Sequence, residues 1–184
     1  MNSRFNNRGE RSFIVTQSLK SMKNFLKEWA LDPKGWSLGS SKEIYDISNI
    51  DEDIYMDSVF HKERWINENG LEQRLIVSYS PKYKHYQQQI RQAQVERAEG
   101  IIEKGSKAKT RNPNNLMRFI EEIQLTIDGE VAEKTSMSLN VKKIAEESMY
   151  DGFTAVCTTL EDDIKDILKV NRRRWEIEES FRIM

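Results

Sequence analysis

The chain has 184 residues, of which 38% are hydrophobic and 32% are charged, and its formal net charge is −1. Because an average domain is roughly 25% charged, this composition predicts a polar, soluble, cytoplasmic protein of one domain. No apolar run approaches the ~20 residues of a membrane span, and the first residues do not resemble a signal peptide. A single cysteine, Cys157, and two histidines exclude a disulfide framework and a zinc site.

Charge is distributed unevenly along the chain. Basic residues outnumber acidic ones between Pro81 and Arg111, whereas acidic residues predominate between Lys42 and Glu72. Lysine and arginine gain free energy when they displace counterions from phosphate, so a basic block beside an acidic one is typical of a protein with a DNA-facing surface. An ordinary charged helix is an equally good interpretation.

The N-terminal region predicts a strand, a short helix and a turn. β-Branched and apolar residues favour a strand over Phe13–Leu19. The helix that follows has an apolar stripe and could be capped by Ser21, and Asp32–Gly35 has the composition of a turn.

Residues 43 to 79 predict a small β-rich unit. Glu43–Ser48 and Val59–Ile66 have the composition of short strands, and Asn69–Gly70 suggests a tight turn. In Gln73–Ser78 apolar and polar residues alternate, which is typical of a strand with one buried face.

A long helix is predicted to begin at Ser80–Pro81, because serine can cap a helix and proline is tolerated in its first turn. Gly105 would end this helix in a left-handed conformation. Mostly apolar residues recur along one side, and we expect this side to pack on the protein's own sheet or, less often, on a partner helix. The positions are Tyr83, Tyr86, Ile90, Ala93, Arg97 and Ile101.

The segment after this helix gives weaker signals. Lys104–Asn115 is a polar, basic connection, and Asn115–Ile123 is compatible with a short helix. Asp128–Gly129 indicates a turn and Met137–Ile144 a strand.

The C-terminal region predicts a strand followed by helices. Asp151–Gly152 indicates a turn into a strand at Phe153–Thr159. Thr159, with Asp162 three residues on, resembles a capping box and would open a helix through about Lys169. A final helix should follow almost directly.

This final helix carries a polar stripe, because residues three and four apart share a helix face. The stripe consists of Asn171, Arg174, Glu178 and Arg182. On spacing alone, the arginine and glutamate four residues apart are an ordinary surface pair worth roughly 0.2–0.5 kcal/mol.

The sequence around Arg174 and Glu178 is more specific than their spacing. Residues 174–182 read Arg-Trp-Glu-Ile-Glu-Glu-Ser-Phe-Arg, with Asn171 three residues before Arg174. This run resembles that of the bacterial insertion-sequence transposases of the Asp-Asp-Glu (DDE) type with a Tyr-Arg-Glu-Lys signature. Arg174 and Glu178 match two of its four positions, Asn171 departs from the Tyr, and the Lys position falls one residue past Met184. Upstream segments also resemble the family in the same order, namely Phe13–Lys20, Trp29–Trp36, Tyr79–Tyr83 and Tyr150–Phe153.

The resemblance implies an α+β fold with a partial ribonuclease-H-like core and a β-rich, helical insertion. Residues 1–20 would supply a core strand, residues 21–150 the insertion, and residues 151–184 a core strand and the Glu-bearing helices. In this family both catalytic Asp residues precede a segment like Phe13–Lys20. We therefore expect a C-terminal fragment of a transposase that is inactive alone.

The resemblance also implies the site residues. Glu178 would be the catalytic residue and the metal ligand for Mg²⁺, which prefers oxygen ligands. Arg172, Arg173, Arg174 and Arg182 would contact DNA. The expected partners are DNA and, in the full-length family, further copies of the chain, with no membrane.

Two other hypotheses stay open. The chain could be a stand-alone DNA-binding or interaction module that uses the basic helix 81–105, or a decaying remnant with exposed apolar sheet edges. Asp151 is interpreted as a turn residue and not as a catalytic Asp. His61 and His85 are interpreted as surface residues.

Overall fold

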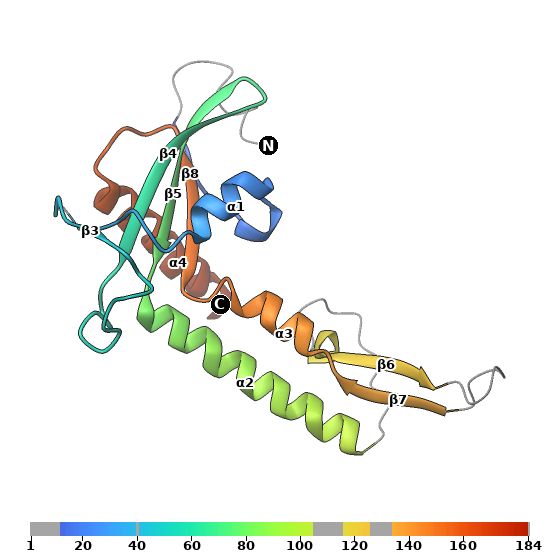
Figure 1. The fold of residues 1–184 in the computed structure, drawn as a ribbon. Helices are drawn as coiled ribbons and strands as arrows, with labels where there is room; N and C mark the ends of the chain where they lie inside the picture. Colours follow the sequence, from blue (N-terminus) through green and yellow to red (C-terminus); the bar gives the residue numbers. More distant parts are fainter. Residues whose placement is uncertain (1–11, 40, 105–115, 126–133, 184) are drawn as a thin grey trace. The chain divides into compact units, whose positions relative to one another are not determined.

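The computed structural model describes residues 12–39, 41–104, 116–125 and 134–183, and it describes side chains for these residues except 123–125, 134–136 and 174–183 (Figure 1). The chain divides into two compact units. The first unit is Met1–Tyr83 with Gly152–Met184, and the second unit is Lys84–Asp151. Helices and antiparallel strands occur together, which confirms the α+β class.

The first unit is built on a six-stranded antiparallel sheet in the order β1-β8-β5-β4-β2-β3. This order sets the N-terminal strand beside the strand near the C-terminus, with Val15 opposite Cys157. The strands are β1 (Ile14–Thr16), β2 (Trp36–Leu38), β3 (Ile44–Tyr45), β4 (Phe60–Glu68), β5 (Leu71–Tyr79) and β8 (Phe153–Thr158).

The two longest strands form a hairpin whose turn was predicted from sequence. Asn69 and Gly70 both adopt positive φ, 54° and 79°, between Glu68 and Leu71, which face each other. A two-residue turn with positive φ at both positions matches the twist of the flanking strands. The predicted turn is confirmed, and the two strands extend beyond their predicted limits.

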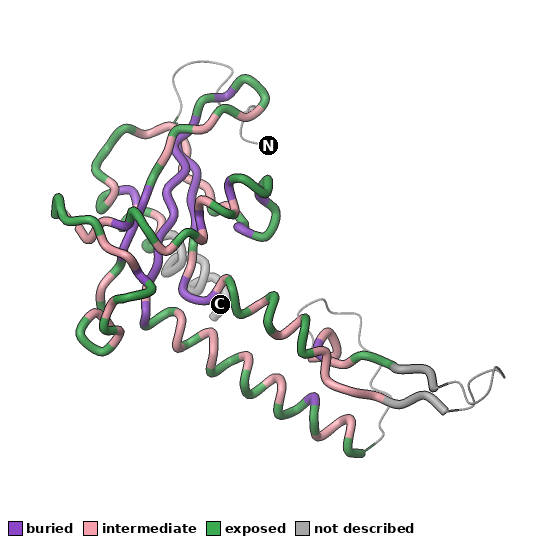
Figure 2. The backbone as a smooth tube through the Cα atoms, viewed as in Figure 1, coloured by how far each residue is buried: buried purple, intermediate pink, exposed green. Residues whose placement is uncertain are grey.

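Both faces of the sheet are covered in the first unit. On one face Ile76 and Val156 pack against Ile167 of α4 (Ile164–Ile183). The other face carries α1 (Asn24–Leu31) (Figure 1). It also carries an aromatic cluster in which Trp36 contacts Tyr79 and Phe153. β5 is therefore buried along almost its whole length (Figure 2). The expectation of one buried and one exposed face on this strand is wrong, because helices and rings cover both sides.

The start of α1 differs from the prediction. Ser21 ends a 3₁₀ turn, η2 (Leu19–Ser21), and Lys23 is the N-cap residue of α1 without a side-chain bond. The predicted turn after α1 is confirmed, since Asp32 Oδ1 accepts from Lys34 N at 3.0 Å and Gly35 has φ +80°.

Helix α4 is one continuous helix, where the sequence predicted two. Its cap is Asp163, whose Oδ1 accepts from Lys165 N at 2.8 Å. The predicted capping box at Thr159 is wrong, because the Thr159 hydroxyl instead accepts from Phe13 N at 3.4 Å. The strand before it, β8, agrees with the prediction.

The second unit contains most of α2 (Pro81–Glu103), then η3 (Leu116–Phe119), a hairpin of β6 (Ile120–Leu125) and β7 (Lys134–Leu139), and α3 (Val141–Ser148). The helix predicted over Asn115–Ile123 is only a 3₁₀ turn that leads into a strand. The strand predicted over Met137–Ile144 ends at Leu139, because Asn140 Oδ1 accepts from Lys143 N at 2.8 Å and caps α3. Asp128–Gly129 and Gly105 lie outside the described residues.

The buried side of α2 is not the predicted one. Tyr86 is 57% exposed and Ile90 is 42% exposed, so the apolar stripe faces solvent. The inward side carries Arg91, Gln94 and the fully buried Ala98, which are three and four residues apart. Packing of this stripe on the protein's own sheet is wrong, because polar partners for Arg91 and Gln94 lie elsewhere in the second unit. Packing on a partner helix stays a prediction.

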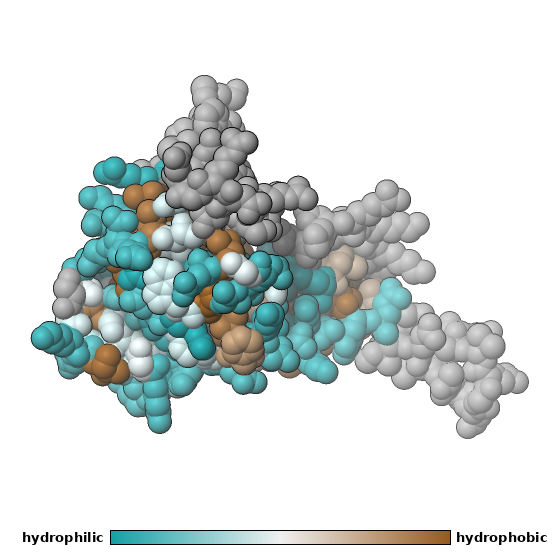
Figure 3. All heavy atoms as spheres, turned by 90° about the horizontal axis from the view of Figure 1, so that it is seen from above, coloured by the Kyte–Doolittle hydropathy of each residue, from teal (hydrophilic) through white to brown (hydrophobic). Residues whose placement is uncertain are grey.

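No helix in the described part of the chain is both long and apolar enough to cross a membrane. Figure 3 shows that hydrophilic residues cover most of the described surface in that view, with apolar residues in small separate patches.

Candidate functional site

The predicted site lies on α4, which is anchored to the sheet at its N-terminal half. Ile167 is buried against Ile76 and Val156, and Ile14 of β1 packs against the same cluster. Glu178 follows Ile167 by eleven residues. Three turns of α-helix take about 10.8 residues, so Glu178 lies about three turns beyond Ile167 on the same helix.

The DNA-binding residues are described only in part. Arg172 and Arg173 are exposed on α4. Arg174, Glu178 and Arg182 belong to the helix, but their side chains lie outside the described part of the structure. The catalytic and metal-binding roles of Glu178 stay predictions.

The face of the sheet that α4 covers includes an edge strand, β1. β1 is an outermost strand that pairs only with β8 in the described sheet. It is held in place at its start, where Thr158 Oγ1 donates to Phe13 O at 2.6 Å. A sheet edge offers unpaired backbone groups that can accept another strand. The predicted Glu therefore lies on a helix that covers a sheet face with an edge strand.

Carboxylates elsewhere in the described residues do not assemble into a metal site. No group of three or more His, Cys, Asp or Glu side chains is placed to hold a metal ion in the ranges that the structure covers. Glu63 pairs with Arg74, and Asp151 pairs with Arg91. The turn at Asp151 is confirmed, since Gly152 follows with φ +83°.

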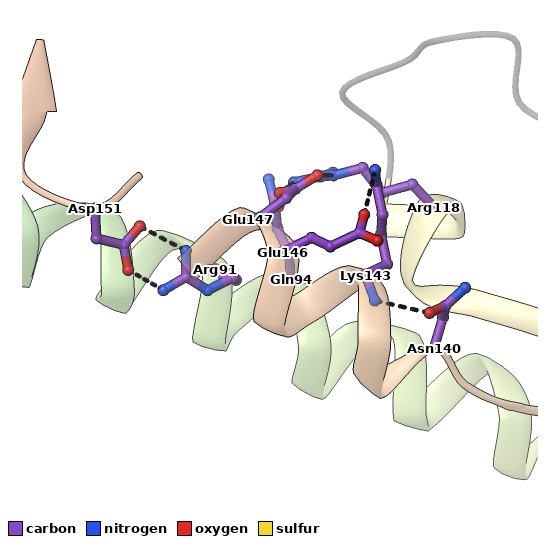
Figure 4. Close-up of polar contacts among 8 residues, drawn as sticks. All are labelled: Arg91, Gln94, Arg118, Asn140, Lys143, Glu146, Glu147 and Asp151. Atoms are coloured by element: carbon purple, nitrogen blue, oxygen red, sulfur yellow. Dashed lines mark hydrogen bonds and ion pairs between the residues drawn. The ribbon is translucent and has the colours of Figure 1, made fainter. Parts of the chain in front are cut away.

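The second unit contains a polar cluster that sequence reasoning missed (Figure 4). Arg118 of η3 donates from Nε to Glu147 Oε1 at 2.9 Å and from Nη2 to Gln94 Oε1 at 2.7 Å. Its guanidinium also lies 4.1 Å from the centroid of the Phe119 ring. These contacts tie η3 to α3 and α2. Their residues are spread over more than fifty positions, so no local pattern could reveal them.

A concave site lies in the first unit. A cavity of about 470 Å³ opens beside the C-terminal end of α1, between this helix, β4 and the start of α4. It is lined by Trp29, Asp32, Lys34, Gly35, Ser37, His61, Lys62, Glu63 and Ile164. The alternation in β4 could have identified Lys62, because Phe60, Lys62 and Arg64 share one face.

His61 corrects the sequence interpretation. It was expected at the surface, but it is only 8% exposed and lies close to residues at the start of α4. Burial lowers the pKa of His61 from its ordinary value, and the nearby Glu63 carboxylate opposes this shift. The imidazole is therefore neutral near pH 7. His85 is half-buried.

The basic helix of the alternative hypothesis has part of its charge already engaged. Lys82 Nζ is 2.7 Å from Asp57 Oδ1, and Arg91 is held by the buried Asp151. Arg97 is exposed, but Glu96 and Glu99 are exposed beside it. The exposed side of α2 therefore carries both signs of charge.

We compared the chain with protein-family models, with curated proteins and with solved structures, and no match was found.

Proposed function

We propose that the chain is the C-terminal part of a DDE-type DNA transposase and that Glu178 is one of its three acidic metal ligands. The two Asp ligands would come from sequence that precedes this chain in the full protein. In this proposal the sheet of the first unit is the distal part of a ribonuclease-H-like core, and the second unit belongs to the insertion.

One observation carries the proposal. Helix α4 packs on β5 and β8 through Ile167, Ile14 of the edge strand β1 packs against the same cluster, and Glu178 follows Ile167 on this helix by about three turns. A strand added at the free edge of β1 would bring its carboxylates toward this helix. The resemblance at 174–182 selects Glu178 from the three glutamates of the segment.

The chemistry sets the demands on these residues. Two divalent ions, about 3.5–4 Å apart in such sites, activate the attacking oxygen and stabilise the leaving oxygen of a phosphodiester. Glu178 would hold one carboxylate oxygen toward this centre. Arg174, one turn earlier, would orient that carboxylate or bind a phosphate. Arg172 and Arg173 would bind the DNA backbone, in keeping with their exposure on α4.

The test uses the chain joined to the coding sequence on either side of it. We expect this longer protein to nick plasmid DNA with Mn²⁺ or Mg²⁺, and we expect Glu178→Gln to lower the rate by at least a thousandfold. Glu179→Gln is the matched control, one position round the same helix, and should keep most of the activity. Full activity in Glu178→Gln would refute the assignment.

The chain alone provides a second test. With one of three acidic ligands it should not nick DNA. Sustained nicking by the purified chain that Glu178→Gln abolishes would show that the other ligands lie within it.

DNA binding by α2 alone is the weaker candidate, because Lys82 and Arg91 face carboxylates within the chain.

A further inference from the structure

The cavity beside α1 contains a lysine in an unusual setting. Lys62 lies in the middle of the sheet's α1-facing side and is only 7% exposed. β2 pairs with β4 at Phe60 and His61, and this pairing ends before Lys62. The cavity of about 470 Å³ lies at this place, and Lys62 lines it.

Two indole rings surround the Lys62 amine. Its Nζ lies 4.5 Å from the centroid of Trp36 and 5.2 Å from that of Trp29. It donates one hydrogen bond of 2.8 Å to the carbonyl oxygen of Asp32, the residue that ends α1. Trp36 Nε1 donates to the same oxygen at 2.8 Å. The amine is therefore fixed in position at the cavity wall.

The surrounding charges leave burial as the main influence on this amine. Burial lowers the pKa of Lys62 to about 8, although the Asp32 carboxylate opposes the shift. Glu63 is paired with Arg74, and the pKa of His61 is lowered by burial. Lys34 is an exposed cation at the cavity rim, and Arg64 lies over the far part of Trp29 at 5.3 Å.

We propose that Lys62 is a nucleophilic amine that binds small aromatic aldehydes in this cavity as an imine. The cavity volume falls in the range of about 300–1,000 Å³ that is usual for small-molecule sites. Half-buried Trp29 lines the cavity, and aromatic rings pair favourably with one another. Desolvation of a lysine is a known way of activating its amine, and Lys62 is buried beside two indole rings.

The proposed step balances without a further reactant. The neutral Nζ attacks the aldehyde carbon, the two amine hydrogens leave with the carbonyl oxygen as water, and a carbon–nitrogen double bond forms. Neither oxidation nor reduction occurs. The amine leaves its bond to Asp32 O when it turns toward the cavity.

Selective labelling of the full chain tests this proposal. Pyridoxal would be added at pH 7.5, the imine reduced with borohydride, and the modified lysines identified by peptide mass spectrometry. At this pH about a quarter of an amine with the pKa of Lys62 is neutral, against about 0.1% of an ordinary lysine of pKa about 10.4. We expect Lys62 to be labelled at least tenfold faster than Lys34, which lines the same cavity and is exposed.

Variants and pH distinguish a reactive lysine from one that only caps α1. Lys62→Arg keeps the cation and should remove the label, whereas Lys34→Arg should leave it unchanged. The rate at Lys62 should rise to half its maximum near pH 8, and Trp29→Ala should move this midpoint upward by admitting water. If Lys62→Arg does not fold, the proposal is tested by the ratio of the labelling rates of Lys62 and Lys34 in the unaltered chain. Labelling of Lys62 at or below the level of Lys34 overturns the proposal.

Discussion

Arg91 and Asp151 form an ion pair with two hydrogen bonds, although the two residues are sixty positions apart in the chain. The side chain of Arg91 is 13% exposed and that of Asp151 is 5% exposed. The pair joins α2, at the start of the second unit, to the turn that follows α3 at its end (Figure 4). The carboxylate raises the pKa of Arg91 further through its hydrogen bond, so Arg91 keeps its charge over the whole accessible pH range.

Removal of Arg91 should destabilise the second unit strongly. Arg91→Ala leaves the Asp151 carboxylate buried without its partner, and such changes cost about 3–5 kcal/mol. Urea unfolding followed by circular dichroism would measure the loss. Arg97→Ala, an exposed position on the same helix, should change the free energy of unfolding by less than about 0.5 kcal/mol. The double variant Arg91→Met with Asp151→Leu should recover much of the stability. An unchanged free energy of unfolding in Arg91→Ala would contradict this account.

Lysine should not be able to replace the branched guanidinium of Arg118, which we call its fork. Arg118→Lys keeps the charge but cannot bond Glu147 and Gln94 together while lying on the Phe119 ring. We expect a loss of about 1–3 kcal/mol, measured by the same unfolding curves. Lys143→Ala, which removes the half-exposed Lys143–Glu146 pair, should cost several times less. Equal losses in the two variants would argue against a special role for the fork.

The hairpin turn should require glycine, whereas helix α2 should not. Gly70 has φ +79°, so Gly70→Ala should cost about 1–2 kcal/mol. Gly100 lies inside α2 with no atom within 4 Å of a Cβ placed there, and Gly100→Ala should stabilise by up to about 1 kcal/mol. Opposite signs in thermal unfolding of the two variants are the expected result. A stabilised Gly70→Ala protein would show that the turn conformation is wrong.

His61 should make the first unit sensitive to acid. Its folded-state pKa is lowered by burial, so the unfolded chain binds more protons as pH falls below the unfolded value near 6.5. Stability should therefore be full above pH 6.5 and decrease progressively below it. His61→Gln should flatten this dependence between pH 7 and 5. An unchanged slope in His61→Gln would sink the prediction.

The exposed arginines of α4 should contribute to DNA binding if the proposed function is right. Each phosphate contact adds about 0.9 to the slope of log affinity against log salt concentration. Replacing both Arg172 and Arg173 by alanine should lower this slope by about 2 and weaken binding equally for all sequences. Lys142→Ala, an exposed cation on α3, is the control and should have little effect. An identical slope in the double variant would exclude these residues from the DNA contact.

The sequence predicted the turns and helix starts that depend on the residues at those positions. Asn69–Gly70 permits positive φ at two successive positions, and Ser80–Pro81 is a favourable helix start, with Ser80 Oγ near Tyr83 N at 3.5 Å. Long strands flanked by such signals were found in the right places. The pairing of β1 with β8, more than 140 residues apart, could not be read from any window of sequence.

The errors share one cause, which is that tertiary partners overrode local preference. The polar side of α2 turned inward because Arg91 and Gln94 meet Asp151 and Arg118. His61 is buried close to the start of α4, and the Lys62 amine is buried beside Trp29 and Trp36. The helix carrying Glu178 was anticipated, but its acidic site stays a prediction.

The chain leaves the six-stranded sheet at Ser80 and re-enters it at Gly152. The backbone amide of Ser80 donates a hydrogen bond of 3.0 Å to the carbonyl oxygen of Gly152. Tyr79 and Phe153 are then directly opposite in neighbouring strands. The segment of about seventy residues between them therefore begins and ends at neighbouring positions in the sheet. The entropy lost when the ends of such a segment are brought together grows only slowly with its length. Evolution could lengthen, shorten or exchange that stretch without shifting the alignment of β5 against β8.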